Sequence, residues 1–152
     1  MTILAVDPGT KTGWALRLPD GSELSGTWDF SPRRGDGAGV RYLRLRVRLD
    51  EIHRLYSIDH LVYELPAGHF KSGAAADVIG GMVGNLQAWA EAAGVPYEAY
   101  APGEIKRHAT GKGNAPKDAI LAAARNKWGD SIADDNQADA CWLLDLAVGA
   151  EM

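Results

Sequence analysis

The chain has 152 residues, a hydrophobic fraction of 46%, a charged fraction of 24% and a formal net charge of −4 at pH 7. These values are ordinary for a folded protein with one core, and we expect residues 1–152 to form a single domain. The one cysteine, Cys141, excludes an intramolecular disulfide and favours a reducing compartment, the cytoplasm, and the sequence has no apolar run typical of a membrane span or a signal peptide.

The charge is unevenly distributed along the chain. Seven arginines fall between Arg33 and Arg54, whereas acids dominate the segment from residue 130 onward. Local patches, rather than the sum of charges, decide whether a polyanion binds. The negative net charge therefore does not exclude a nucleic-acid partner.

The N-terminal segment indicates three strands in antiparallel order. Residues 2–7 form a short apolar run that ends at Asp7, directly before a Pro-Gly turn. Residues 13–18 and 23–30 flank Pro19-Asp20-Gly21-Ser22, which is a hairpin turn signal. We expect the first strand to end at Asp7 and the next two to form a hairpin.

Residues 40–56 follow a loop rich in Gly, Pro and Arg, and they fit two patterns. Residues 43–49 alternate between apolar residues and arginine, as a strand does. Leu45, Leu49 and Ile52 also recur at helical spacing, among strong helix formers. We interpret the segment as a helix, because a crossover is needed to reach the next parallel strand.

The rest of the chain alternates between strands and helices. In chain order we expect a strand over 61–64, a helix over 72–93 ended by Gly94, a strand over 95–100, a short helix over 102–108, a loop over 110–114, a helix starting at Pro116 and reaching 128, and a final helix capped by Asp134 or Asp135. The fold class is therefore α/β, a five-stranded mixed sheet flanked by helices.

Four acidic residues occupy positions that can converge. Asp7 and Glu64 each end a strand, and parallel neighbouring strands lie about 4.8 Å apart. Asp135 and Asp139 are four residues apart, which places them on one helix face about 6 Å from each other. Four clustered carboxylates need cations between them, and hard oxygen ligands suit Mg²⁺ or Mn²⁺. Two such ions, about 3.5–4 Å apart, can activate a water and stabilise the leaving oxygen of a phosphodiester.

Each acid also has an ordinary structural interpretation. An Asp before Pro-Gly, such as Asp7, is commonly a turn residue, and Asp135 alone is more often a helix cap than a ligand. Glu64 and Asp139 stand among apolar neighbours, where an unpaired acid is costly. The conjunction of the four, rather than any one of them, indicates a metal-dependent site.

Four motifs in order resemble the RuvC-type Holliday-junction resolvases, which have the RNase H-like fold. The segment from Ile3 to Ala15 is similar to the first-strand motif of that family, and Val62-Tyr63-Glu64 stands where the family has its second acid. The segment from Gly111 to Lys117 resembles its glycine-rich, lysine-bearing stretch. Residues 135–140 resemble its C-terminal acidic motif, so the resemblance spans nearly the whole chain.

The resemblance implies a site and a cofactor. Asp7, Glu64, Asp135 and Asp139 would be catalytic and would bind two Mg²⁺ ions, for which Mn²⁺ can substitute. Lys117 would stabilise negative charge that develops on the scissile phosphate.

One departure concerns the last acidic motif. Cellular members often carry two acids, or a His and an Asp, three residues apart. Here the residue three before Asp139 is Asn136, and Asp135 stands one position earlier. Asp134 is the alternative ligand. Viral members do use a close pair of acids just ahead of the final Asp, so a phage or prophage origin is an expectation that follows from the resemblance.

The resemblance also implies partners. The protein would be a homodimer that cuts two symmetry-related strands of a four-way DNA junction, since paired nicks on a two-fold substrate need two equivalent sites. The helix that carries Gly80, Gly81 and Gly84 offers a flat surface for a second copy. Packing of these glycines against the protein's own sheet is the alternative.

The expected DNA contacts are cations near the glycine-rich stretch and in the loop before residue 40, with one aromatic side chain after Glu64 that would stack on unpaired bases. They are Lys106, Arg107, Lys112, Lys117, Arg33, Arg34 and Phe70. The alternatives are a solvated charged loop for the cations and a core position for Phe70. The arginines of residues 40–56 are compatible with an exposed helix face far from DNA.

Three other functions are compatible with parts of the sequence. The same acids would serve a nuclease that acts on an RNA–DNA hybrid or another branched nucleic acid. A sugar-kinase or actin-like domain would use the segment from Asp7 to Lys11 for phosphate, but those folds need two such halves. A catalytically inactive junction-binding protein is the third, and the complete set of acids speaks against it.

Overall fold

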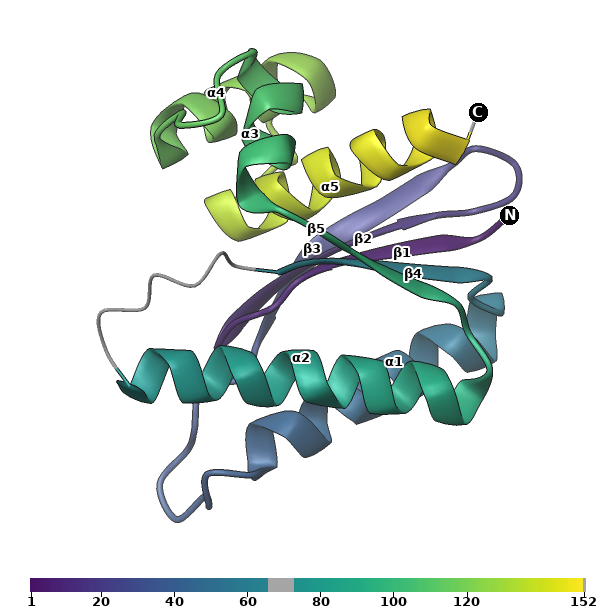
Figure 1. The fold of residues 1–152 in the computed structure, drawn as a ribbon, viewed down its shortest axis with the longest axis vertical. Coiled ribbons are helices and arrows are strands. Elements are labelled where there is room, and N and C mark those ends of the chain that lie inside the picture. Colours follow the sequence, from purple (N-terminus) through teal and green to yellow (C-terminus); the bar gives the residue numbers. More distant parts are fainter. Residues whose placement is uncertain (66–72, 152) are drawn as a thin grey trace.

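The computed structural model describes residues 1–65 and 73–151, with the side chain of residue 151 left out. Its five-stranded sheet has the order β3-β2-β1-β4-β5. Helices α1 and α2 cover one face of the sheet, and α3, α4 and α5 lie over the other (Figure 1). The strands are β1 (Ile3–Asp7), β2 (Lys11–Arg17), β3 (Glu23–Asp29), β4 (His60–Glu64) and β5 (Tyr97–Tyr100). The helices are α1 (Val40–Tyr56), α2 (Gly73–Ala93), α3 (Pro102–Thr110), α4 (Lys117–Trp128) and α5 (Asp135–Glu151).

The strand directions confirm the expected mixed sheet. β1 pairs antiparallel with β2, and β2 pairs antiparallel with β3. β4 is parallel to both β1 and β5, with Val6 opposite Tyr63. The carboxyl ends of β1 and β4 therefore meet at the same edge of the sheet, which is where α/β proteins place their sites.

Strand β1 is buried on both faces, which explains its unbroken apolar sequence. Leu4 and Val6 belong to the core beneath α1 and α2, whereas Ile3 and Ala5 belong to the core beneath α3, α4 and α5. The two cores hold the strand from both sides. Asp7, the next residue, is thereby fixed at the point where the chain leaves the interior.

The segment over residues 40–56 is a helix, as expected, and not a strand. Leu45, Leu49 and Ile52 are buried against the sheet. The alternating pattern leaves Leu43 and Val47 outside, with exposed fractions of 62% and 49%. The segment forms a helix because the helical spacing places apolar side chains on one face, where they cover the sheet.

Several boundaries differ from those expected. β2 begins at Lys11 rather than residue 13, because Lys11 pairs with Asp29 across the hairpin. Proline 116 is the N-cap of α4 rather than its first helical residue, with an extended ψ of 161°. β5 is shorter than expected and begins at Tyr97. Within the described residues, no helix is long and apolar enough to span a membrane.

Candidate active site

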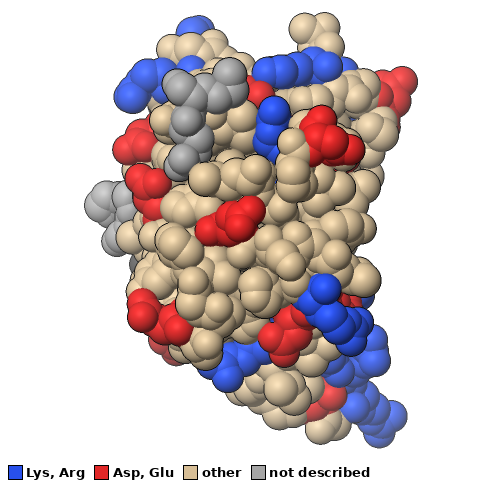
Figure 2. Space-filling view, turned by 90° about the vertical axis from the view of Figure 1, so that its right-hand side faces the viewer, with Lys and Arg blue, Asp and Glu red and all other residues tan. Residues whose placement is uncertain are grey.

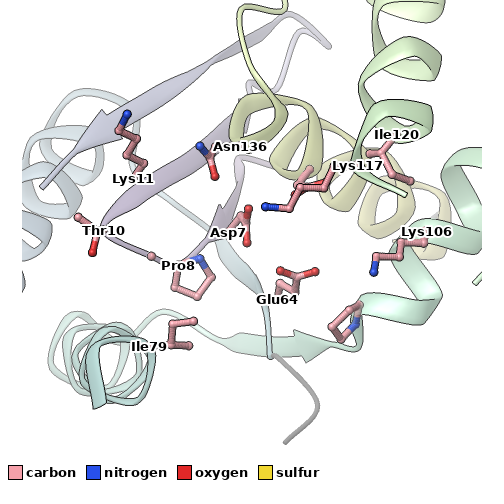
Figure 3. A pocket seen from close by; sticks show the side chains of 13 residues that line it. Asp7, Pro8, Thr10, Lys11, Glu64, Ile79, Lys106, Lys117, Ile120 and Asn136 are labelled. Atoms are coloured by element: carbon pink, nitrogen blue, oxygen red, sulfur yellow. The ribbon is translucent and has the colours of Figure 1, made fainter. Parts of the chain in front are cut away.

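Three carboxylates from distant parts of the sequence line one cleft at the carboxyl edge of the sheet. Asp7 and Glu64 come from the ends of β1 and β4, and Asp139 comes from α5. The carboxyl groups of Asp7 and Glu64 lie next to each other, and the Lys117 ammonium points toward Asp7 (Figure 3). The full lining is Asp7, Pro8, Gly9, Thr10, Lys11, Glu64, Ile79, Pro102, Lys106, Lys117, Ile120, Asn136 and Asp139.

Burial and the proximity of other acids raise the pKa values of two of these carboxyl groups. Burial raises the pKa of Asp7 well above its ordinary value, and the charge of Glu64 and a hydrogen bond shared with it raise that pKa further. Burial, with the charges of Glu64 and Asp135, raises the pKa of Asp139 to about 7. Lys117 opposes both shifts. Full ionisation of the cleft near neutral pH therefore needs added positive charge.

The first turn of α5 is fastened to the hairpin of β2 and β3. The Asp134 carboxylate accepts hydrogen bonds from the backbone N–H of Gln137 and the hydroxyl of Thr27, both at 2.8 Å. The Gln137 amide in turn donates to Ser25 at 2.9 Å. The sequence predicted a helix cap at Asp134 or Asp135, and the structure has it at Asp134. Asp134 does not line the cleft.

Gly13 lets the same turn approach β2 closely. A side chain at this position would overlap the backbone carbonyl of Asn136. The contact sets how α5 is rotated about its axis, and with it which residues of the helix face the cleft. Asn136 and Asp139 line the cleft, whereas Asp135 stands beside it and pairs with Lys117 at 3.5 Å.

Comparison with known proteins identifies the family. A crossover junction endodeoxyribonuclease RuvC of Rhodopirellula baltica is 32% identical over 128 residues, covering 81% of this chain and 71% of the relative. One from Ruegeria pomeroyi is 32% identical over 123 residues, covering 80% and 74%. The chain belongs to the RuvC family. No model of a protein family matches the chain.

Solved structures agree with this assignment. The chain superposes on Thermus thermophilus RuvC in complex with a Holliday junction substrate with a TM-score of 0.81 and 25% identity, over all of this chain and 96% of that one. The Thermus RuvC structure itself gives a TM-score of 0.78 and 26% identity over the same shares. The yeast mitochondrial resolvase Ydc2, at 14% identity and a TM-score of 0.58 over 93% and 75% of the two chains, shares the fold.

The cations expected from the sequence of this RuvC-family protein divide into two groups. Lys106 and Lys117 line the cleft directly. Arg107 and Lys112 are exposed on α3 and on the loop that follows it, and Arg33 and Arg34 are exposed in the loop between β3 and α1. Phe70 lies outside the described residues.

Sequence reasoning missed three residues of the cleft wall. Thr10 comes from the turn between β1 and β2, Lys11 is the first residue of β2, and Asn136 was noted only as a departure from the family pattern. The spacing of three between Asn136 and Asp139 was the available signal, since residues three apart share a helix face.

The donor chemistry of the cleft fits a hard divalent cation. Carboxylate oxygens are the ligands that Mg²⁺ and Mn²⁺ prefer, and burial and neighbouring acids raise the pKa values of Asp7 and Asp139 although Lys117 lowers them. In the part of the chain that is described, no three acidic, histidine or cysteine side chains already stand in ligating geometry. The carboxylate side chains would therefore have to move closer together to bind an ion.

Proposed function

We propose that this protein is a Mg²⁺-dependent endonuclease that resolves four-way DNA junctions by paired, symmetric nicks. The convergence of Asp7, Glu64 and Asp139 in one cleft of a RuvC-family fold carries the proposal. A Thermus relative with the same fold has been solved with a Holliday junction substrate. We also propose that residues 1–152 act as one domain in the cytoplasm, where the buried, unpaired Cys141 stays reduced.

The three cleft carboxylates would hold the metal. Asp7, Glu64 and Asp139 would supply oxygen ligands of two Mg²⁺ ions, with Mn²⁺ as a substitute, and Asp135, which pairs with Lys117, would be a further ligand. Held by these residues, the ions would supply activation of a water and stabilisation of the leaving oxygen of the phosphodiester.

The protein's own cations and amide complete the site. Lys117, whose side chain is 80% exposed, lies between the acids and solvent and is placed to meet an incoming phosphate. Lys106 lines the same wall of the cleft. Among the described residues, none exchanges a hydrogen bond with the side-chain amide of Asn136, so this amide is available to a substrate or to a metal-bound water.

The resolvase would act as a homodimer, with α2 at the interface. Gly80 and Gly84 face open space, so this side of α2 is flat and accessible. Gly81 instead packs against the ring of Tyr42 on α1. Gly81 thus packs inside the protein, on α1 rather than on the sheet, whereas the open side at Gly80 and Gly84 would receive the second copy.

Cleavage of a synthetic four-way junction in Mg²⁺, beside a linear duplex and an RNA–DNA hybrid, tests the proposal. We expect symmetric nicks on the junction alone, and none from the Asp7→Asn protein. Cutting of the hybrid in preference to the junction would assign the same site to a ribonuclease H-like activity. Tight junction binding without cleavage in any divalent metal would leave a binding protein.

A further inference from the structure

The cleft has a second wall, formed by the turn between β1 and β2 and by the first residue of β2. Thr10 and Lys11 line the cleft opposite Lys106 and Lys117, so that the acids lie between the two sides (Figure 3). The turn is firmly held. The buried Thr12 hydroxyl donates to the carbonyl of Gly9 at 2.7 Å, and the backbone N–H of residue 30 donates to the carbonyl of Thr10 at 2.8 Å.

Arg41 brings an unneutralised guanidinium to this wall. It stands in the first turn of α1 and donates a hydrogen bond from Nη1 to the Thr10 hydroxyl at 3.0 Å. Its neighbours Arg44 and Arg48 pair with Asp36 and Glu51, at 3.0 Å and 3.4 Å. No carboxylate of the described residues lies within ion-pair distance of Arg41, so its charge and its remaining N–H donors are available.

Further positive charge extends the wall away from the acids. The pKa of Asp29 is lowered, first by hydrogen bonds from Ser31 and then by the charges of Lys11 and Arg33, so both cations lie near this carboxylate. The end of the molecule turned away from the cleft is different: acids are spread across its middle, and Lys and Arg side chains gather at its upper and lower margins (Figure 2).

We propose that Lys11 and Arg41 bind DNA backbone phosphates on the side of the scissile phosphodiester opposite Lys106 and Lys117. The acids of the cleft floor repel a polyanion, and cations on one wall alone would hold the strand off-centre. Cations on both walls hold it across the floor, with the scissile phosphate above Asp7. The planar guanidinium of Arg41 can contact a phosphate while it keeps its bond to Thr10. The inference rests on the proposed function, and it moves Arg41 from a remote helix face to the DNA path.

Salt-dependent junction binding tests the inference. Arg41→Gln and Lys11→Gln would be measured in the inactive Asp7→Asn background, with Arg46→Gln as the matched control. Arg46 is an exposed arginine of the same helix and does not line the cleft. Each lost phosphate contact reduces the slope of log affinity against log salt by about 0.9 and weakens binding about tenfold at 0.1 M salt. The control is expected to match its parent.

The outcomes are distinguishable. If Asp7→Asn binds the junction and both test variants match Arg46→Gln, the second wall is wrong and the proposed function stands. If Asp7→Asn does not bind the junction, the proposed function and the inference fall together. Lys11 is exposed and makes no hydrogen bond to a described residue through its side chain, so Lys11→Gln keeps the test valid even where Arg41→Gln loosens α1.

Discussion

The acids of the cleft are held closer together than their charges favour. Burial and mutual repulsion raise the pKa values of Asp7 and Asp139, and Lys117 offsets only part of this effect. A shift of one pKa unit corresponds to about 1.4 kcal/mol. Without a bound cation, the clustered acids therefore reduce the stability of the folded protein at neutral pH. A divalent cation bound between them would relieve this repulsion.

The raised pKa of Asp139 predicts how the free energy of unfolding depends on pH. The pKa of Asp139 is 3.8 in a model peptide and about 7 in the folded protein, so between these values the folded state binds the extra proton. The contribution of Asp139 to the free energy of unfolding is fully present below pH 3.8 and is lost as pH rises through 7. Asp139→Asn removes this loss, and we expect it to be about 1–2 kcal/mol more stable than the parent at pH 8.

Urea unfolding in EDTA from pH 4 to pH 8 measures the difference between the two proteins. We expect the curves to separate as pH rises and to converge again when Mg²⁺ is added to the parent. A constant difference across this range would show that Asp139 is not strained in the folded protein.

Lys117 lines the cleft beside the acids. Lys117→Ala removes a charge that lowers the pKa values of Asp7 and Asp139 and that would contact the phosphate in the proposed mechanism, so we expect kcat to fall about 10²-fold. The melting temperature should change little, because the side chain is 80% exposed. Single-turnover cleavage with a thermal melt checks both expectations. Arg46→Ala, which removes an exposed cation of α1 that does not line the cleft, is the control, and an equal loss of cleavage rate in both variants would argue against a role of Lys117 in the chemical step.

At the scale of elements, the first turn of α5 decides which of its residues enter the cleft. It is held by the bonds of Asp134 to Thr27 and of Gln137 to Ser25, and by the approach of Asn136 to Gly13. These contacts join the hairpin to the helix on which Asp139 stands. The rotation of α5, and not its sequence alone, places Asn136 in the cleft and Asp135 beside it.

Gly13→Ala tests this placement. The new methyl group would overlap the Asn136 carbonyl, so β2 or α5 must move, and we expect a loss of about 1–3 kcal/mol in stability together with weaker cleavage. Gly149→Ala is the control. Gly149 lies on α5 with nothing within 4 Å of the added methyl, so this substitution should not destabilise the protein. Chemical denaturation and a cleavage assay measure both effects. Unchanged activity in Gly13→Ala would show that the position of α5 is not critical.

At the scale of the whole molecule, the proposed paired nicking would need two copies of the chain. Gly84→Arg places a long charged side chain on the open side of α2, and we expect it to convert a dimer to a monomer. Sedimentation would show the change in mass, and cleavage of a junction on supercoiled DNA would yield single nicks instead of paired ones. Gly149→Arg, which also faces open space, controls for the added charge. A Gly84→Arg protein that stays dimeric would place the interface elsewhere.

The sheet and the meeting of Asp7 with Glu64 could be predicted because the signals are local, and Asp139 was named from the family resemblance. Apolar runs closed by turn residues mark strand ends, and parallel strands bring Asp7 and Glu64 to one edge. The spacing of three residues between Asn136 and Asp139 does not by itself select Asn136 over Asp135, because the placement depends on contacts with residues more than 100 positions away. The place of Arg41 depends likewise on how α1 begins against the turn at Thr10.

The most direct test of the central claim is a crystal structure of the protein soaked in Mn²⁺, with data collected at the manganese absorption edge. We expect anomalous peaks between the carboxylates of Asp7, Glu64 and Asp139, and their loss in the Asp7→Asn protein. Peaks at another site, or none at saturating Mn²⁺, would contradict the assignment of this cleft as a metal-dependent nuclease site.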